Sequence, residues 1–270
     1  MTDRRSCLRF ALIWTLAVAA PVAAAPLVVD EGGSLLRGIV TDQSVDLPLD
    51  PSRADAPRPT SAVAPVRLAP KKGEPAVFDG LTGRLAPLEF VRADVRPDLV
   101  WDPASGELSE RGDVVALAVD RADLPGAADR VALIRRVREL VQRAGQTMRL
   151  QPDDRAARLG ARVELQISDV AGRSVAVFSV DGIGRTTLLY PTKLDPTVIA
   201  APDLAVPLDA SAPTGTDNLV VLSTTGDLSG FVRSLRRLDR RRAAGEALGL
   251  LDAVDGGDLR VGTRALMVQP

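Results

Sequence analysis

The spacing of apolar residues in the middle of the chain predicts one long helix. Over residues 123–144, apolar positions such as Val131 and Ile134 recur at helical intervals, while arginines fill most of the opposite side. Pro125 is typical of a helix start and Gly145 of a helix end. We therefore expect an amphipathic helix that buries its apolar stripe.

Beyond this helix, apolar and polar residues alternate with a period of two, which predicts β-strands. Val163, Leu165 and Ile167 would face one side of such a strand, with charged or amide side chains on the other. We expect strands at 113–119, 162–167, 174–180, 186–190, 204–208, 218–222 and 259–268, and a turn at 181–184. Two short helices are expected near the end of the chain, lined by Phe231, Leu235 and Leu238, and by Leu248, Leu251 and Val254.

A proline-rich segment precedes these elements. Seven prolines interrupt residues 46–75. Proline disfavours helix interiors and central strands, so the segment is expected to be an extended linker or a disordered arm. A ligand for a proline-recognition domain is the alternative, although no clear P-x-x-P repeat is present. Upstream, apolar patches within residues 26–42 could form a short hairpin.

These patterns predict an α+β fold that is mainly β: an antiparallel β-sandwich-like domain with packed helices, preceded by the proline-rich extended segment and a strand–helix unit. The expected divisions are a signal peptide at 1–24, an N-terminal segment with the linker at 25–96, the strand–helix unit at 97–150, and the β domain at 151–270.

The first 24 residues have the three parts of a secretory signal peptide. Arginines at positions 4, 5 and 9 precede a short uncharged run at 11–20, and small residues follow it. Cleavage after Ala24 is favoured, because cleavage after Ala25 would place Pro26 beside the scissile bond. An uncleaved anchor is the alternative reading. A lipoprotein is disfavoured because Cys7 precedes the apolar run.

Composition excludes several kinds of chemistry. The chain has no histidine, which removes His-dependent catalytic triads and dyads and every His-containing metal site. Its one cysteine, Cys7, lies in the signal peptide, so the mature protein would have neither a thiol nucleophile nor a disulfide. The formal net charge is −1, and it becomes −3 when Asp3 and the three signal-peptide arginines are removed. This near balance gives no reason to expect nucleic acid as the main partner.

The densest charge cluster is an arginine run near the C-terminus. It comprises Arg233, Arg236, Arg237, Arg240, Arg241 and Arg242. The first five are the candidate partner surface, which would suit an acidic protein, lipid headgroup or polyanion. The favoured alternative is the solvated back of an amphipathic helix covering residues 233–242.

For the other candidate residues, a structural role is favoured over a functional one. Asp252, Asp255 and Asp258 suggest calcium but lack the order of ligands in an EF-hand, so a turn after a helix is favoured. Asp153-Asp154 with Asp195 as paired carboxylates, and Lys193 with a nearby hydroxyl as a nucleophile, both lack the required spacing. Trp101 and Tyr190 are expected to pack in the core. We thus predict no catalytic residue, no cofactor site and no metal site.

Two segments resemble a known family. Residues 174–191, Ser-Val-Ala-Val-Phe-Ser-Val-Asp-Gly-Ile-Gly-Arg-Thr-Thr-Leu-Leu-Tyr-Pro, resemble the central hairpin of the bacterial domain-of-unknown-function 4384 family, and residues 213–222 resemble its later Pro-x-Gly strand. Residues 98–101 and 112–115, with a helix opening near Asp129, resemble the region that precedes this domain in some bacterial caspase-like proteins. The family has no established catalytic residues, and its occurrence beside diverse enzymes implies a binding or scaffold module.

The expected function is a non-enzymatic, exported interaction or scaffold protein of the cell envelope, periplasmic or secreted. Its partner would be another envelope protein, and no transmembrane segment is expected after signal cleavage. The alternative is an accessory subunit of a hydrolase or peptidase system, or a hydrolase that works without His or Cys.

Overall fold

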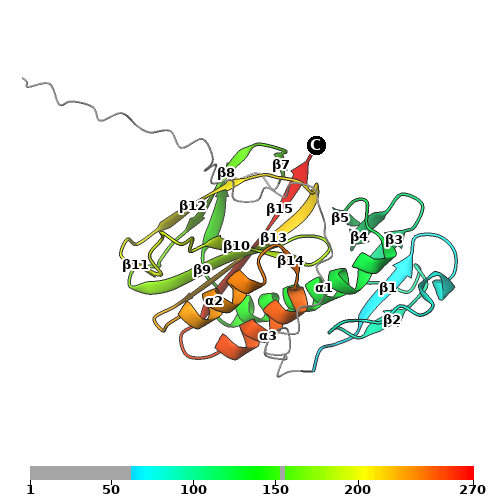
Figure 1. The fold of residues 1–270 in the computed structure, drawn as a ribbon, viewed down its shortest axis with the longest axis horizontal. Helices are drawn as coiled ribbons and strands as arrows, with labels where there is room; N and C mark the ends of the chain where they lie inside the picture. The colour runs from blue at the N-terminus through cyan, green and yellow to red at the C-terminus, as the bar shows by residue number, and fades with distance from the viewer. Residues whose placement is uncertain (1–61, 153–155) are drawn as a thin grey trace, which may run out of the picture. The chain divides into compact units, whose positions relative to one another are not determined.

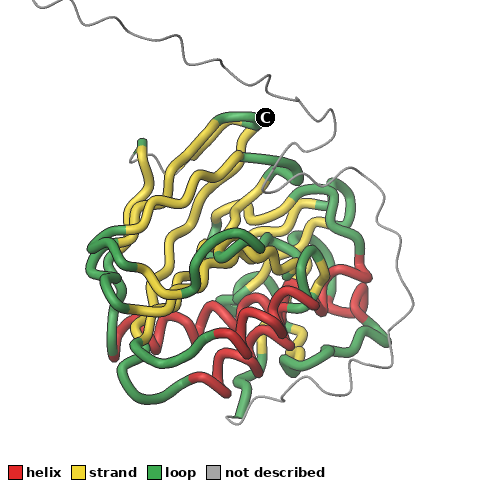
Figure 2. Tube along the Cα trace, turned by 60° about the vertical axis from the view of Figure 1, so that its left-hand side comes forward, coloured by secondary structure: helices red, strands yellow, loops and turns green. Residues whose placement is uncertain are grey.

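The structure is a computed structural model that describes residues 62–152 and 156–270. The expected signal peptide, the hairpin within 26–42 and the linker as far as residue 61 lie outside the described residues. The described part contains helices on one side of a large mixed sheet and a small sheet on the other (Figures 1 and 2). The predicted class, α+β and mainly β, is confirmed.

Three α-helices form in the predicted regions, although the second ends earlier than predicted: α1 (Leu124–Arg143), α2 (Ser229–Arg237) and α3 (Ala244–Val254). Short 3-10 turns, η2 (Pro75–Phe78) and η3 (Arg121–Asp123), lie before the first of them. Pro125 stands in the first turn of α1, where its missing N–H has no intrahelical partner to lose. The apolar positions of all three helices are buried in one core.

The large sheet has 12 strands among the described residues. Its strands are β1 (Val66–Pro70), β2 (Leu88–Phe90), β3 (Leu99–Asp102), β4 (Glu107–Glu110), β5 (Asp113–Ala116), β7 (Ala156–Arg158), β9 (Arg173–Val180), β10 (Arg185–Tyr190), β11 (Val198–Ile199), β13 (Gly215–Thr224), β14 (Arg241–Arg242) and β15 (Arg260–Gln269). The main path runs β14-β10-β9-β13-β5-β4-β3-β1-β2, and β15 also pairs with β13.

The small sheet forms the other half of the sandwich. It consists of β6 (Met148–Gln151), β8 (Arg162–Ile167) and β12 (Leu204–Asp209), joined antiparallel in the order β12-β8-β6. In β8 the apolar positions 163, 165 and 167 are buried, as their alternation predicts.

Strands β9 and β13 lie between two cores because successive side chains point to opposite faces of a sheet. Phe178 and Val220 face the helices, whereas Val177 and Val221 face the small sheet. This explains why all eight residues of β9 are buried. Trp101 and Tyr190 are both buried, as expected; Trp101 donates its Nε1–H to the carbonyl of Val119 at 3.0 Å.

Two local predictions need correction. The linker was expected to continue to residue 75, but Val66–Pro70 forms β1 between β2 and β3. Its prolines stand just before and at the end of the strand, so the amides between them remain free to pair. The strand expected at 113–119 ends at Ala116, because the chain turns at Ala118, which has φ of 52°.

Pairing also differs from a purely antiparallel sandwich. Strand β1 runs parallel to both β2 and β3, and β7 runs parallel to β15. The central hairpin of β9 and β10 is antiparallel, with the predicted turn at 181–184 between its strands.

Candidate functional site

Arg233, Arg236, Arg237, Arg240 and Arg241, which we call the arginine surface, are all exposed. The first three are spaced on α2 so that they share its outer side, while Phe231 and Leu235 are buried beneath them. The predicted solvated back of an amphipathic helix is therefore present over this part of the run.

The predicted helix does not extend to residue 242. It ends at Arg237, and the chain then turns through Arg240, whose φ is 59°. The backbone amide of Arg240 bonds to the carbonyl of Thr186, and Arg241–Arg242 form β14 against β10. Pairing with the edge of β10 overrides the helical pattern of this segment.

Local carboxylates neutralise little of the arginine surface. Among the described residues its one ion pair joins Arg240 to Asp239 at 4.0 Å, and Arg236 reaches only the carbonyl of Pro191. Other arginines form shorter ion pairs with carboxylates, for example Arg173 with Asp258 at 2.9 Å. The arginine surface therefore carries positive charge that is available to a partner.

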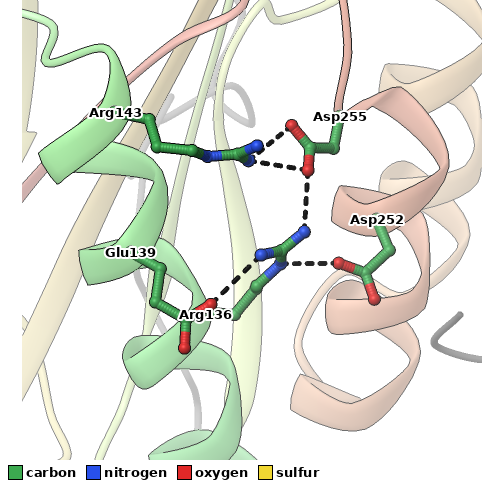
Figure 3. A network of polar contacts seen from close by, with 5 residues as sticks. All are labelled: Arg136, Glu139, Arg143, Asp252 and Asp255. Atoms are coloured by element: carbon green, nitrogen blue, oxygen red, sulfur yellow. Dashed lines mark hydrogen bonds and ion pairs between the residues drawn. The ribbon is translucent and has the colours of Figure 1, made fainter. Parts of the chain in front are cut away.

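The calcium candidates instead bind arginines. Asp252 of α3 accepts from Arg136 Nε at 2.8 Å, and Asp255 accepts from Arg136 and from Arg143, each at 2.7 Å (Figure 3). Asp258 bonds to the Thr224 hydroxyl, which lowers the pKa of its carboxyl to about 2 together with nearby amides and Arg173. These carboxylates connect elements of the fold.

The remaining predicted candidates are not brought together. Asp195 accepts from the amide and hydroxyl of Thr192 within its own loop. The pair Asp153-Asp154 lies outside the described residues. Across the described ranges, no three His, Cys, Asp or Glu side chains are grouped as a metal site would require.

A pocket that the sequence patterns do not predict lies between the two sheets. Its volume is about 60 Å³, and it opens among β9, β10, β12, β13 and β15. Apolar residues, including Leu189, Leu219 and Leu266, form part of its wall. Asp181 and Asp217 also line it and are shared with a smaller adjoining cavity of about 40 Å³.

Strand register places these two carboxylates opposite each other. Asn218 pairs with Val180 across β13 and β9, so the next antiparallel step brings Asp217 opposite Asp181. Both side chains therefore leave the sheet on the face of Leu219, while Asn218 points to the helices. With the Asn218 amide turned so that its oxygen faces Arg130, that oxygen accepts from the guanidinium at 2.8 Å.

The turn that carries Asp181 is locked in position. Asp181 Oδ1 accepts from the amides of Ile183 and Arg185 at 3.0 and 2.8 Å. A Cβ on Gly182 would overlap the carbonyl oxygen of Val115, and one on Gly184 would overlap that of Gly126 in α1. The absence of side chains at these positions lets the turn dock between β5 and the start of α1.

The electrostatic environment of the pair is unusual. Burial is the largest of the causes that raise the pKa of Asp217 to about 7. The negative charge of Asp181 also raises it, and this effect is larger than the opposing effect of Arg130. Burial also raises the pKa of Asp181, against the hydrogen bonds from the turn. Neither carboxylate makes an ion pair within 4.0 Å in the part of the chain that the structure describes.

The sequence patterns place Asp181 in a turn and begin a predicted strand at Asn218, directly after Asp217. In the sequence, the one sign of a site was that each aspartate adjoins an apolar strand. Asp181 and Asp217 are more than thirty positions apart along the chain. The pairing of β9 with β13 brings them together in the fold.

No helix within residues 62–152 or 156–270 combines the length and the apolar character that crossing a bilayer requires. No family model, curated protein or solved structure matches the chain.

Proposed function

We propose that this chain is a non-enzymatic, exported interaction protein of the cell envelope that binds an acidic protein through the arginine surface. The observation that carries the proposal is the exposure of five arginines within nine residues, with one 4.0 Å ion pair among them. Export rests on the signal-peptide pattern of residues 1–24, and a scaffold role also fits the resemblance to the domain-of-unknown-function 4384 family.

The arrangement suits recognition of carboxylates. A guanidinium offers planar, paired N–H donors that match a carboxylate, and it stays charged at every physiological pH. Burial of Phe231 and Leu235 fixes the helix that presents the first three arginines. Fixed charges lose less entropy on binding than charges on a mobile segment.

An acidic protein fits better than a continuous polyanion. Asp227 and Asp239 stand beside the arginine surface, and they would repel phosphates that follow it along a nucleic-acid backbone. A protein partner can place its carboxylates opposite the arginines alone.

The test compares two triple variants of equal charge. Arg233→Glu/Arg236→Glu/Arg237→Glu reverses the arginine surface, while Arg149→Glu/Arg158→Glu/Arg162→Glu makes the same change at exposed positions of β6, β7 and β8. Binding to poly-L-glutamate is measured at 20 mM and 150 mM salt, with phosphatidylglycerol vesicles and single-stranded DNA as parallel probes.

We expect the first variant to bind poly-L-glutamate at least tenfold more weakly and the control to bind within twofold of the unmodified protein. Equal weakening of both variants would contradict a localised surface. Binding to vesicles or DNA without binding to poly-L-glutamate would contradict an acidic protein partner, and hydrolytic turnover by the purified protein would contradict a non-enzymatic role.

A further inference from the structure

The pocket between the sheets contains a feature that the fold does not require. Asp181 directly follows the last residue of β9, and Asp217 stands on the neighbouring strand β13, one step beyond the last pair of the two strands; both side chains line the pocket. Directly opposed residues of an antiparallel pair have Cβ atoms about 5 Å apart, and like charges there destabilise the sheet. Such a pair persists when something compensates its mutual repulsion.

The described residues compensate that repulsion only in part: the charges of Arg130 and Arg185 favour the ionised carboxyl groups, but without an ion pair. Asp181 uses one carboxylate oxygen for backbone amides of its own turn. Arg130 approaches from the other face of the sheet, where it bonds to Glu110 at 2.7 Å and to Asn218. Arg185 and Arg240 line the pocket, but neither lies within ion-pair distance of the two carboxylates.

We propose that this pocket binds a primary ammonium group on a short aliphatic chain, with Asp181 and Asp217 as its acceptors. The ammonium would donate hydrogen bonds to both carboxylates and place one positive charge between them. The alkyl chain would contact Leu189, Leu219 and Leu266 in the pocket wall. This site is separate in its chemistry from the binding of an acidic partner proposed above.

Several properties favour an ammonium over a metal ion. The volume of about 60 Å³ exceeds the roughly 15 Å³ that a single water needs, so a small organic group fits. A divalent ion prefers six or more oxygen ligands and a strongly negative site. Here the charge of Arg185 offsets part of the negative charge of Asp181, and much of the wall is apolar.

The raised pKa values of the two carboxyl groups support this assignment. Without a ligand, burial and repulsion hold a proton on the pair near neutral pH. A cation that binds between the carboxylates would take the place of that proton. Ser179 and Thr187 also line the pocket and supply hydroxyls that can accept a further ammonium proton.

The ammonium could belong to a free amine or to a lysine side chain of a partner protein. The experiment titrates the full mature protein with n-butylammonium and with Nα-acetyl-lysine N-methylamide at pH 8, following backbone amide resonances of Gly182, Gly184 and Gly215 by NMR. 1-Butanol supplies the tail without charge, tetramethylammonium the charge without N–H donors, and Mg²⁺ a divalent cation.

We expect saturable shifts with n-butylammonium and at least tenfold weaker binding to Asp217→Asn and Asp181→Asn, which retain side-chain shape. Asp94→Asn removes an exposed carboxylate outside the pocket and should bind normally. Binding of the lysine derivative as well would assign the ligand to a partner's side chain; binding of the amine alone would assign it to a free amine.

Four results would overturn the proposal: no shift up to 50 mM n-butylammonium, unchanged affinity in Asp217→Asn, equal binding of 1-butanol, or shifts with Mg²⁺ but not with the amine. The arginine variants of the previous test leave Asp181 and Asp217 unchanged. Failure of either proposal is therefore distinguishable from failure of the other.

Discussion

Arg130 in α1 donates to Glu110 in β4 at 2.7 Å, and its side chain is only 2% exposed. The same guanidinium faces the side-chain amide of Asn218 in β13, whose oxygen accepts from it when the amide is turned toward Arg130. One side chain thus joins the long helix to two strands that lie on either side of β5 in the large sheet.

Replacing Glu110 by Gln should destabilise the protein strongly. The change leaves the buried Arg130 charge without its carboxylate, and breaking a buried pair in this way costs about 3–5 kcal/mol. Urea unfolding measures the loss. Arg130→Met/Glu110→Gln removes both charges and should recover part of it, whereas a double variant no more stable than Glu110→Gln would contradict the pairing.

Gly184→Ala should cost much more than Gly160→Ala. Both glycines have nearly the same positive φ, 84° and 83°, so the intrinsic backbone strain is matched. A Cβ at 184 would overlap the carbonyl oxygen of Gly126, whereas a Cβ at 160 meets nothing within 4 Å. We expect about 1 kcal/mol of destabilisation at 160 and at least about 3 kcal/mol at 184.

The comparison is made by thermal and urea unfolding of both variants. Equal losses would show that the 181–184 turn does not rest on α1. A greater loss at 184 would also be accompanied by changed NMR shifts in the first turn of α1.

Asp217→Asn should stabilise the protein at alkaline pH. The folded-state pKa of Asp217, about 7, lies above the ordinary 3.8. The folded state therefore binds this proton more tightly, and the associated stability, present below pH 4, is lost as pH rises toward 7. Removing the charge should recover roughly 2–4 kcal/mol at pH 8 and little at pH 4.

Unfolding free energies at pH 4, 6 and 8 measure this effect, with Asp94→Asn as the exposed control. A gain that is the same at all three pH values would mean that ionisation of Asp217 is not responsible.

Strand β1 should mark the limit of N-terminal truncation. Val66 and Leu68 are fully buried, and β1 separates β2 from β3. A fragment beginning at residue 62 should unfold cooperatively, whereas one beginning at residue 72 should lose that cooperativity because β2 loses its partner. Stable folding of the shorter fragment, measured by circular dichroism and urea unfolding, would contradict the central role of β1.

Export predicts a defined mature terminus. Protein recovered from the periplasm or medium should begin at or near Ala25, as N-terminal sequencing would show. Recovery there of a chain that still begins at Met1 would contradict cleavage.

Local sequence patterns predict where the helices and strands lie, but they do not predict which strands pair with one another. The spacing of Val131 and Ile134 located α1, and the alternation in residues 162–167 located β8. The pattern of the arginine run predicts a helix as far as residue 242. Arg241 and Arg242 pair instead with the edge of β10, which local patterns could not reveal because β10 is distant in sequence. Proline content concealed β1 for a similar reason: its pairing uses only the amides between the prolines.

The candidate sites show the same limit. The arginine surface was visible because its residues are adjacent, whereas the opposition of Asp181 and Asp217 arises from register between strands. Asp252 and Asp255 resembled metal ligands until Arg136 and Arg143 were placed beside them by the packing of α1 on α3.

The contacts along β10 determine how this margin of the large sheet can meet other chains. Its outward amide at Leu188 bonds to the Asp239 carboxylate, its carbonyl at Thr186 accepts from Arg240, and β14 covers the positions beside them. Backbone groups occupied in this way cannot template an additional strand. Strand addition at these positions of β10 is thereby blocked, which would limit sheet-to-sheet polymerisation of the folded chain when it is crowded.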